Sequence, residues 1–320
     1  MTTLLGHDSA WREWRSAAAS PRMHHAWMLT GLKGLGKGLF ARAAAAELVA
    51  EPGVPQPPTD LHPDILIPEH PPENKEEAKK REDGAEYRRK RSIPIDEIRQ
   101  MTHRLHTRPT LGSRRVVIID PADDLERNAA NALLKALEEP PQGTFFLLVT
   151  HRPGRLLPTI RSRCRVLRFA PLEATKIDAI LRENAPQADA PARAAAVAAA
   201  EGSPGAALDF VGQDLGKVHQ LMTRLITEGD EHFALRGALA EEIGTRPDRE
   251  RQQAAVDLAR AVVAAELGRG DAAHTQQAIA VHGDLVRLSG QLPTYNFDPA
   301  LAMMEIGALL ASLAMPREAV

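Results

Sequence analysis

The chain has 320 residues, of which 43% are hydrophobic and 26% are charged, and its formal net charge is −2. This length allows two or three folded domains, and the near-neutral charge excludes a strongly basic nucleic-acid binder. A single cysteine excludes a disulfide framework and a cysteine-based zinc site, and the histidines show no metal-ligand spacing. Since the sequence shows neither a signal peptide nor a long apolar run, we expect a cytoplasmic protein that crosses no membrane.

The first half of the chain alternates short apolar runs with helical patterns. The run Ala26–Thr30 predicts a first strand, and the alanine-rich run Lys37–Glu51 predicts the helix that follows it. Four further strands are predicted at Ile65–Ile67, Val116–Ile119, Phe145–Val149 and Arg165–Phe169. Apolar runs of this kind are typical of parallel strands covered on both faces, so the pattern predicts a doubly wound α/β domain.

A phosphate-loop motif lies between the first strand and its helix. The run GLKGLGKG over residues 31–38 matches the pattern G-x-x-x-x-G-K-[ST] at every fixed position but the last. Gly31, Gly34 and Gly36 allow backbone N–H groups to face a phosphate, and Lys37 reaches the terminal phosphates. The Ser or Thr that holds Mg²⁺ in such loops is replaced by Gly38, which has no side-chain oxygen.

Two segments interrupt the predicted α/β domain. Residues 51–63 contain repeated prolines and are predicted to lack regular structure. Residues 73–91 are highly charged and are predicted to form a mobile surface loop. The basic end of this loop, Arg88–Arg91, leaves contact with nucleic acid open, although the acids of the same loop favour a solvated insertion.

The second half of a nucleotide site is also incomplete. The predicted strand Val116–Ile119 leads into Asp120, which is placed to act on the metal. The next residue is Pro121, where hydrolytic relatives carry the Glu that activates water, so the general base is missing. Hydrolysis in cis is therefore not expected. The sequence leaves open whether the loop only shapes the turn or holds ATP or ADP without hydrolysing it.

An arginine-dense turn follows the fourth predicted strand. Asn128–Arg165 reads as a helix, a proline stop, a buried strand and a turn in which Arg161, Arg163 and Arg165 surround the lone Cys164. Core packing does not call for three arginines at this spacing. The turn is therefore predicted to bind a negatively charged group.

After Ala170-Pro171 the chain becomes alanine-rich and helical, without strand signals. We predict a small helical second domain that ends near Gly212, with further helices to the C-terminus. The predicted helices are Glu173–Asn184, Ala192–Ala200, Asp248–Glu266, Thr275–Leu288 and one that begins at Asp298-Pro299-Ala300.

Several runs in this order and spacing resemble one family. They are Leu5-Gly6-His7, His25-Ala26-Trp27, His62-Pro63-Asp64, Ile95–Arg99, Asn131–Pro141 and Ser162-Arg163-Cys164. In these runs the chain resembles the delta-prime subunits of the bacterial DNA polymerase III clamp loader, within the AAA+ superfamily. The resemblance covers most of residues 5–170, whereas residues 171–320 match mainly in helical pattern, with Gly202-Ser203-Pro204-Gly205 as the best anchor.

The resemblance implies three domains and a role. These are an AAA+ P-loop α/β domain with a parallel sheet over residues 1–170, a small helical lid over 171–213, and an all-α collar that oligomerises over 214–320. Such a subunit is a stator of the DNA polymerase III holoenzyme, a DNA-directed DNA polymerase complex, and does not hydrolyse ATP. Its implied partners are the gamma/tau motor subunits and the clamp-opening delta subunit. It meets the sliding clamp and primer–template DNA through the assembly.

The resemblance also assigns individual residues. Arg163 would enter the ATP site of the neighbouring motor subunit as an arginine finger in trans, while Arg161 and Arg165 serve local packing or ion pairs. Thr150 matches the polar sensor residue of the superfamily, although a strand-terminal hydroxyl with a local backbone bond explains it equally well. Gly205 stands where motor subunits carry a second sensor arginine. The four-cysteine zinc module of many relatives is missing from residues 51–61, so no zinc is expected.

Two alternatives remain open at this stage. The chain would be an ATP-hydrolysing motor subunit if water held Mg²⁺ in place of the missing hydroxyl. It would be a DNA-binding scaffold if Arg88–Arg91 and the arginine-dense turn bound phosphates, with an affinity that falls steeply with salt.

Overall fold

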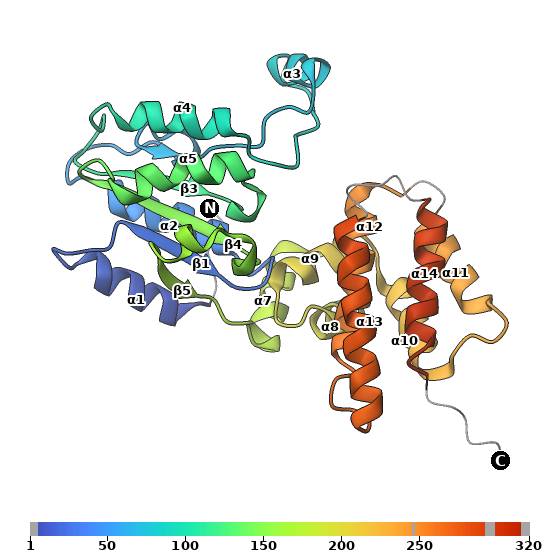
Figure 1. The fold of residues 1–320 in the computed structure, drawn as a ribbon. Coiled ribbons are helices and arrows are strands. Elements are labelled where there is room, and N and C mark those ends of the chain that lie inside the picture. Colours follow the sequence, from blue (N-terminus) through green and yellow to red (C-terminus); the bar gives the residue numbers. More distant parts are fainter. Residues whose placement is uncertain (1–5, 245–246, 292–297, 315–320) are drawn as a thin grey trace. The chain divides into compact units, whose positions relative to one another are not determined.

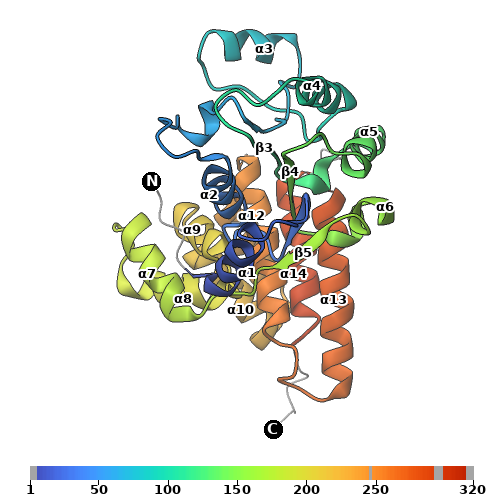
Figure 2. The ribbon, with the colours of Figure 1, turned by 90° about the vertical axis from the view of Figure 1, so that its left-hand side faces the viewer.

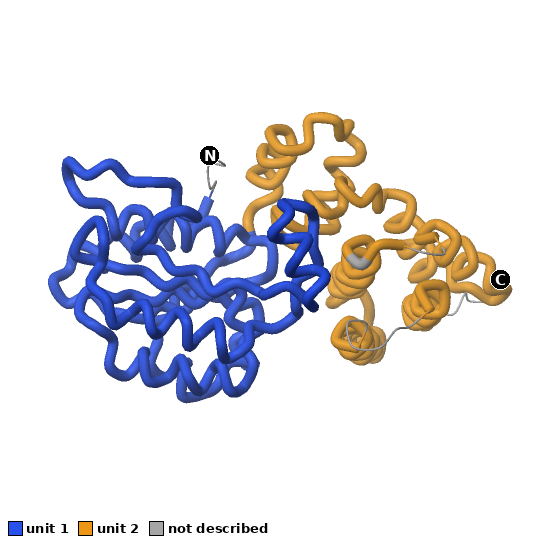
Figure 3. The backbone as a smooth tube through the Cα atoms, turned by 90° about the horizontal axis from the view of Figure 1, so that it is seen from above, with its two compact units in different colours: residues 1–171 blue, residues 172–320 orange. Residues whose placement is uncertain are grey.

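The computed structural model describes residues 6–244, 247–291 and 298–314. Leu5, the first residue of one family-typical run, lies outside the described residues. The chain divides into two compact units, residues 1–171 and 172–320 (Figure 3). The first unit holds all the strands of the sheet, and the second is built from helices.

The first unit is built on a five-stranded parallel sheet with the order β2-β3-β4-β1-β5. The strands are β1 (Ala26–Thr30), β2 (Ile65–Leu66), β3 (Arg115–Ile119), β4 (Thr144–Thr150) and β5 (Arg165–Arg168). All five predicted strands are therefore confirmed. β4 is inserted between β1, which leads into the phosphate loop, and β3, which leads into Asp120.

Helices cover both faces of this sheet, as predicted (Figures 1 and 2). One face packs against α1 (Asp8–Ala18) and α2 (Lys37–Val49), and the other against α4 (Ile95–Leu105) and α5 (Arg127–Glu138).

Successive side chains of a strand point to opposite faces, so each central strand serves two cores. In β3, Val116 and Ile118 join the cluster with α1 and α2, whereas Val117 and Ile119 join the cluster with α4 and α5. All four side chains are fully buried. This double burial explains why the strand reads as a continuous apolar run.

Two predicted loops contain short helices, which corrects the sequence prediction. Residues 51–63 include a 3₁₀ turn at Thr59–Leu61, and the charged segment 73–91 includes α3 (Lys75–Glu82). Asn74 caps α3 by accepting a hydrogen bond from the backbone N–H of Glu77. The Glu77 carboxylate is itself buried, and it accepts bonds from Lys80 and from the backbone N–H of Arg88 at 2.6 Å. Charge density alone could not reveal that one acid of the run is an internal anchor.

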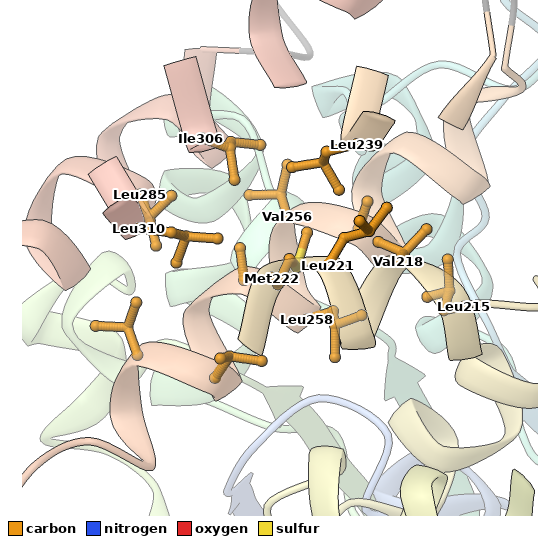
Figure 4. Packing of buried hydrophobic residues seen from close by; sticks show 14 of the residues in the cluster. Leu215, Val218, Leu221, Met222, Leu239, Val256, Leu258, Leu285, Ile306 and Leu310 are labelled. Carbon is orange, nitrogen blue, oxygen red and sulfur yellow. The ribbon is translucent and has the colours of Figure 1, made fainter. Parts of the chain in front are cut away.

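The second unit consists of eight helices within the described residues. They are α7 (Ala174–Asn184), α8 (Ala190–Ala199), α9 (Pro204–Gly212), α10 (Gly216–Glu228), α11 (Ala234–Ile243), α12 (Arg249–Ala264), α13 (Ala272–Gln291) and α14 (Pro299–Ala311). One hydrophobic cluster extends from α7 to the end of α14, and Figure 4 shows part of it, including Met222, Val256, Leu285 and Leu310. A division of this unit into separate lid and collar domains stays a prediction.

The run Gly202-Ser203-Pro204-Gly205 contains the start of a helix. Ser203 caps α9 by accepting a hydrogen bond from the backbone N–H of Ala206 at 3.2 Å, and Pro204 is the first residue of the helix. Serine at the cap and proline directly after it are the usual signals of a helix start, so the sequence carried this information. Across the parts of the chain that the structure describes, none of the helices is long and apolar enough to cross a membrane.

Candidate functional site

The phosphate loop follows β1 directly, and its last two residues are the first two of α2. Gly31, Gly34 and Gly36 all have positive φ angles, of 151°, 81° and 81°. A Cβ at position 31 would also lie only 2.6 Å from the carbonyl oxygen of Phe169, so glycine is required there. His7 also contacts the loop, because its Nε2 lies 2.8 Å from the carbonyl oxygen of Leu35. The backbone thus has the tight turn that a phosphate loop needs.

Lys37 is directed into its own loop. It is only 2% exposed, and its Nζ donates to the carbonyl oxygens of Gly31 at 2.7 Å and Leu32 at 2.6 Å. Burial lowers the pKa of the ammonium group to about 8, against the opposing effect of the carboxylates of Asp120 and Asp123. The side chain that would bind terminal phosphates is therefore engaged by the loop itself.

Asp120 follows β3 and lies against the first turn of α2. Its Oδ2 is so close to Gly38 that a Cβ at position 38 would clash with it. The same oxygen lies 3.5 Å from Nη1 of Arg42, and Nε of Arg42 lies 3.2 Å from Oδ1 of Asp60. Burial raises the pKa of the Asp120 carboxyl, and the neighbouring Arg42 and Lys37 oppose that rise.

These residues do not fit the Mg²⁺ ion that a phosphate loop implies. The usual protein ligands are a Ser or Thr hydroxyl and an aspartate oxygen. Position 38 offers no side-chain oxygen, and the space beside it is filled by the Asp120 carboxylate, which already faces a guanidinium. No group of three or more His, Cys, Asp and Glu residues within the described ranges could hold a metal ion elsewhere.

The side chains of Thr150 and Asp123 are hydrogen-bonded to each other at the end of β4. The Thr150 hydroxyl donates to Oδ1 of Asp123 and accepts from the backbone N–H of Arg152 at 3.2 Å. The other oxygen of Asp123 accepts the backbone N–H of His151 at 2.6 Å. Thr150 is fully buried, and its sensor role stays a prediction. Asp123 was not predicted, although an acid just after the end of β3 was a signal that pointed to this edge of the sheet.

Arg163 lies in the turn between α6 (Pro158–Arg161) and β5. Its Nη2 lies 2.7 Å from Oε1 of Glu138 at the end of α5, and its Nη1 donates to the carbonyl oxygen of Thr159 at 2.9 Å. The side chain is 35% exposed, so the guanidinium is oriented by the chain but remains open to a partner.

Arg165, the first residue of β5, makes contacts within its own unit, as expected from the sequence. Arg165 Nη2 lies 2.9 Å from Oε1 of Glu13, and its guanidinium carbon lies 4.8 Å from the ring centre of Trp27. An ion pair and a cation–π contact hold this side chain against its own unit. Arg163 differs in its partner, because it pairs with the last residue of α5.

The sheet register separates Arg163 from the phosphate loop. β5 runs parallel to β1, with Arg165 beside Trp27 and Arg168 beside Thr30. Arg163 precedes β5, whereas the loop follows β1, so the two lie at opposite edges of the sheet, at least about 10 Å apart at ~3.3 Å per residue. The structure gathers Lys37, Asp120 and Thr150 at the carboxyl edge and leaves Arg163 at the amino edge.

Two of the family-typical runs have structural roles. Both carboxylate oxygens of Asp64 accept backbone N–H groups, from Thr110 and Leu111, at 2.7 Å. Nε2 of His25 lies 2.8 Å from the carbonyl oxygen of Leu137, where α5 ends. Each of these residues directly precedes a strand, so both lie at the amino edge of the sheet, opposite the phosphate loop.

The model of the family described as "DNA polymerase III, delta subunit" matches residues 6–173, more than half of the chain. The chain belongs to this family. The resemblance to the delta-prime subunits, stated above from short runs, is thereby confirmed. The match covers the α/β unit, in which both the phosphate loop and the arginine turn lie.

Curated relatives agree with the family model. The chain is 35% identical over 162 residues to DNA polymerase III subunit delta' of Pseudomonas aeruginosa, covering 47% of this chain and 44% of that protein. It is 44% identical over 120 residues to the delta' subunit of Escherichia coli strain K12, covering 37% of this chain and 35% of that protein. The tau subunit of the same strain is 29% identical over 236 residues, covering 70% and 36%. The chain thus spans less than half the length of these relatives.

Proposed function

We propose that this chain is a non-hydrolysing subunit of the DNA polymerase III clamp loader and supplies Arg163 to ATP held by a neighbouring motor subunit. The observation that carries the proposal is the position of Arg163. It stands at the sheet edge opposite its own phosphate loop, with a partly exposed guanidinium that two contacts orient. An arginine in that place has no phosphate of its own chain to serve.

The state of the phosphate loop supports the absence of hydrolysis. Gly38 and Pro121 remove the metal ligand and the general base, and Arg42 pairs with the remaining acid, Asp120. Phosphoryl transfer depends on a positioned metal and a positioned nucleophile, and this loop lacks the side chains that usually position them. These contacts favour the stator over the motor alternative. Any ATP or ADP in the loop would be bound without turnover.

An arginine supplied in trans can still accelerate the reaction of a neighbour. Its planar fork of N–H donors stabilises the charge that develops on the transferred phosphoryl group. In GTPases the same device raises the rate by about 10³–10⁵.

The partners follow from the family and its relatives. Since relatives include tau as well as delta' subunits of DNA polymerase III, we infer that the neighbour is a gamma/tau motor subunit. The delta subunit, the sliding clamp and primer–template DNA would be met within the same cytoplasmic assembly, which acts in DNA replication.

The DNA-binding scaffold has less support. In the basic end of segment 73–91, Arg89 Nη1 lies 3.7 Å from Oε2 of Glu69 and its guanidinium carbon lies 5.2 Å from the ring centre of Tyr87. Arg81 meets the same Glu69 oxygen at 3.7 Å. These cations are partly compensated by the chain itself, which weakens the attraction to a phosphate backbone.

The test is DNA- and clamp-stimulated ATP hydrolysis by the reconstituted loader, with this chain wild-type or Arg163→Ala. We expect turnover to fall by about 10³ or more while the assembly keeps its size in gel filtration. Arg161→Ala is the matched control, because Arg161 is an exposed arginine of the same turn, and it should leave turnover unchanged. Unchanged turnover by the Arg163→Ala assembly would refute the trans role.

A second variant tests the proposal that the phosphate loop of this chain takes no part in hydrolysis. Lys37→Ala should have little effect on turnover by the assembly, because the lysine is bonded to its own loop and the site lacks a metal ligand. A large loss of loading activity in this variant would show that the loop takes part in catalysis.

A further inference from the structure

Arg42 stands one helical turn after Gly38 on the same face of α2, since residues four apart in a helix are neighbours. Its guanidinium lies between two carboxylates, with Nε 3.2 Å from Asp60 and Nη1 3.5 Å from Asp120. It pairs directly with the aspartate that would face a metal in a working loop. The phosphate loop therefore has a positive charge beside Asp120 without any bound ion.

The space around Gly38 is shared by this pair. A Cβ at position 38 would clash with Oδ2 of Asp120 and would lie 3.6 Å from Nη1 of Arg42. The carboxylate and the guanidinium thus fill the volume that the missing hydroxyl and its metal would take. The glycine is needed for this packing, rather than being only the loss of an oxygen.

We propose that Arg42 is a resident counter-ion that replaces Mg²⁺ beside Asp120 and makes the phosphate loop unable to take a divalent cation. The cation is attached to the chain, so it needs no free ion in solution. A guanidinium also stays charged at every physiological pH.

Electrostatics supports exclusion rather than coexistence. Asp120 already has two cations near it, Arg42 and the buried Lys37, and both act on the ionisation of its carboxyl. A dication placed beside the same oxygen would be repelled by both, because like charges at close range repel one another. Mg²⁺ would therefore have to displace the guanidinium before it could bind.

Access does not explain the exclusion. Arg42, Asp60 and Asp120 line one cavity of about 530 Å³, and the side chains of Arg42 and Asp120 are 35% and 23% exposed. A small ion from solvent can therefore reach the carboxylate once the guanidinium is removed. This makes the proposal testable with the metal alone, without nucleotide.

The experiment measures the melting temperature of the full chain in EDTA and in millimolar magnesium chloride. An ion that binds only the folded state raises the melting temperature. We expect no magnesium response from the wild-type chain. Arg42→Ala should melt lower in EDTA, because Asp120 loses its counter-ion, and should recover in magnesium. Arg42→Ala combined with Asp120→Asn should not respond to magnesium.

Two further variants keep the result decisive. Arg42→Gln keeps the length of the side chain without its charge, and serves if Arg42→Ala does not fold. Arg15→Ala is the matched control, because it frees the surface carboxylate of Glu47, paired at 2.6 Å, where no metal position exists. A wild-type chain that responds to magnesium as strongly as Arg42→Ala, or an Arg42 variant with no response, would overturn the proposal. Neither outcome depends on the role of Arg163.

Discussion

Arg42 and Arg163 lie in the same unit, are exposed to the same extent, at 35%, and each faces a carboxylate, yet their surroundings differ. Arg42 stands between two acids at the carboxyl edge of the sheet. Arg163 meets one acid, at a helix end on the amino edge. The number and position of the neighbouring acids, rather than exposure, separate the arginine that we propose closes its own site from the one that we propose is offered to another chain.

The ion pairs themselves contribute little stability. Partly exposed pairs are typically worth about 0–1 kcal/mol, because water screens them and two long side chains lose freedom. The two arginines therefore matter mainly through the place where they hold a positive charge.

The largest expected effect concerns the shape of the donor group. Arg163→Lys keeps the charge but loses the planar fork, so we expect it to lose most of the rate that Arg163→Ala loses, which for arginine fingers is about 10³–10⁵. ATP turnover by the reconstituted assembly measures this. Full activity with lysine would mean that Arg163 acts only as a point charge.

The next effect concerns the packing at Gly38. Gly38→Thr restores the motif but forces a Cβ against Oδ2 of Asp120, so the free energy of unfolding should fall by about 1–3 kcal/mol. Chemical denaturation measures this. Gly216→Thr is the matched control, because Gly216 also lies in the first turn of a helix and a Cβ there meets nothing within 4 Å. An equal loss of unfolding free energy in both variants would show that the contact with Asp120 does not affect stability.

A smaller effect concerns pH. Burial, and then the nearby Lys37, lower the pKa of His151 from 6.5 to about 4. Between these values the unfolded chain binds more protons than the folded chain, so stability rises with pH across this window and falls as pH drops through it. His151→Gln should flatten the dependence by an amount on the order of 1 kcal/mol, given the partial exposure of the ring. Denaturation curves from pH 4 to 7 test this, with the exposed His232→Gln as control.

The smallest expected effect concerns the ion pair between Glu138 and Arg163. Glu138→Gln removes the charge that orients Arg163, and loss of a pair worth up to about 1 kcal/mol should lower turnover by up to about fivefold without changing assembly. Glu138→Asp should restore part of it. A rise in turnover would instead show that Glu138 competes with phosphate for the guanidinium.

Much of the α/β unit was predictable, because its strands are apolar runs with few alternatives. Ala26–Thr30 has the predicted bounds, and the glycines of the loop stand where the motif places them. The loss of the hydroxyl at Gly38 was also visible in the sequence. What filled the resulting space was not, because the pairing of Arg42 with Asp120 joins α2 to a strand from another part of the chain.

The same limit applies elsewhere in the molecule. Helix α3 was missed because its anchor is the burial of Glu77, which composition cannot reveal. The contact between Glu138 and Arg163 was missed because β4 separates the two residues in the sequence. Periodicity predicts which face an element buries, but partners across elements depend on the register of the sheet.

The position of Cys164 has a practical consequence. Its thiol packs against the cluster of α4 and α5, and burial raises its pKa to about 12. At pH 8 only about one thiol in ten thousand would be ionised, so the folded chain should react very slowly with alkylating reagents. As the single cysteine of the sequence, directly after Arg163, it is a built-in chemical probe whose labelling rate reports how often this turn opens.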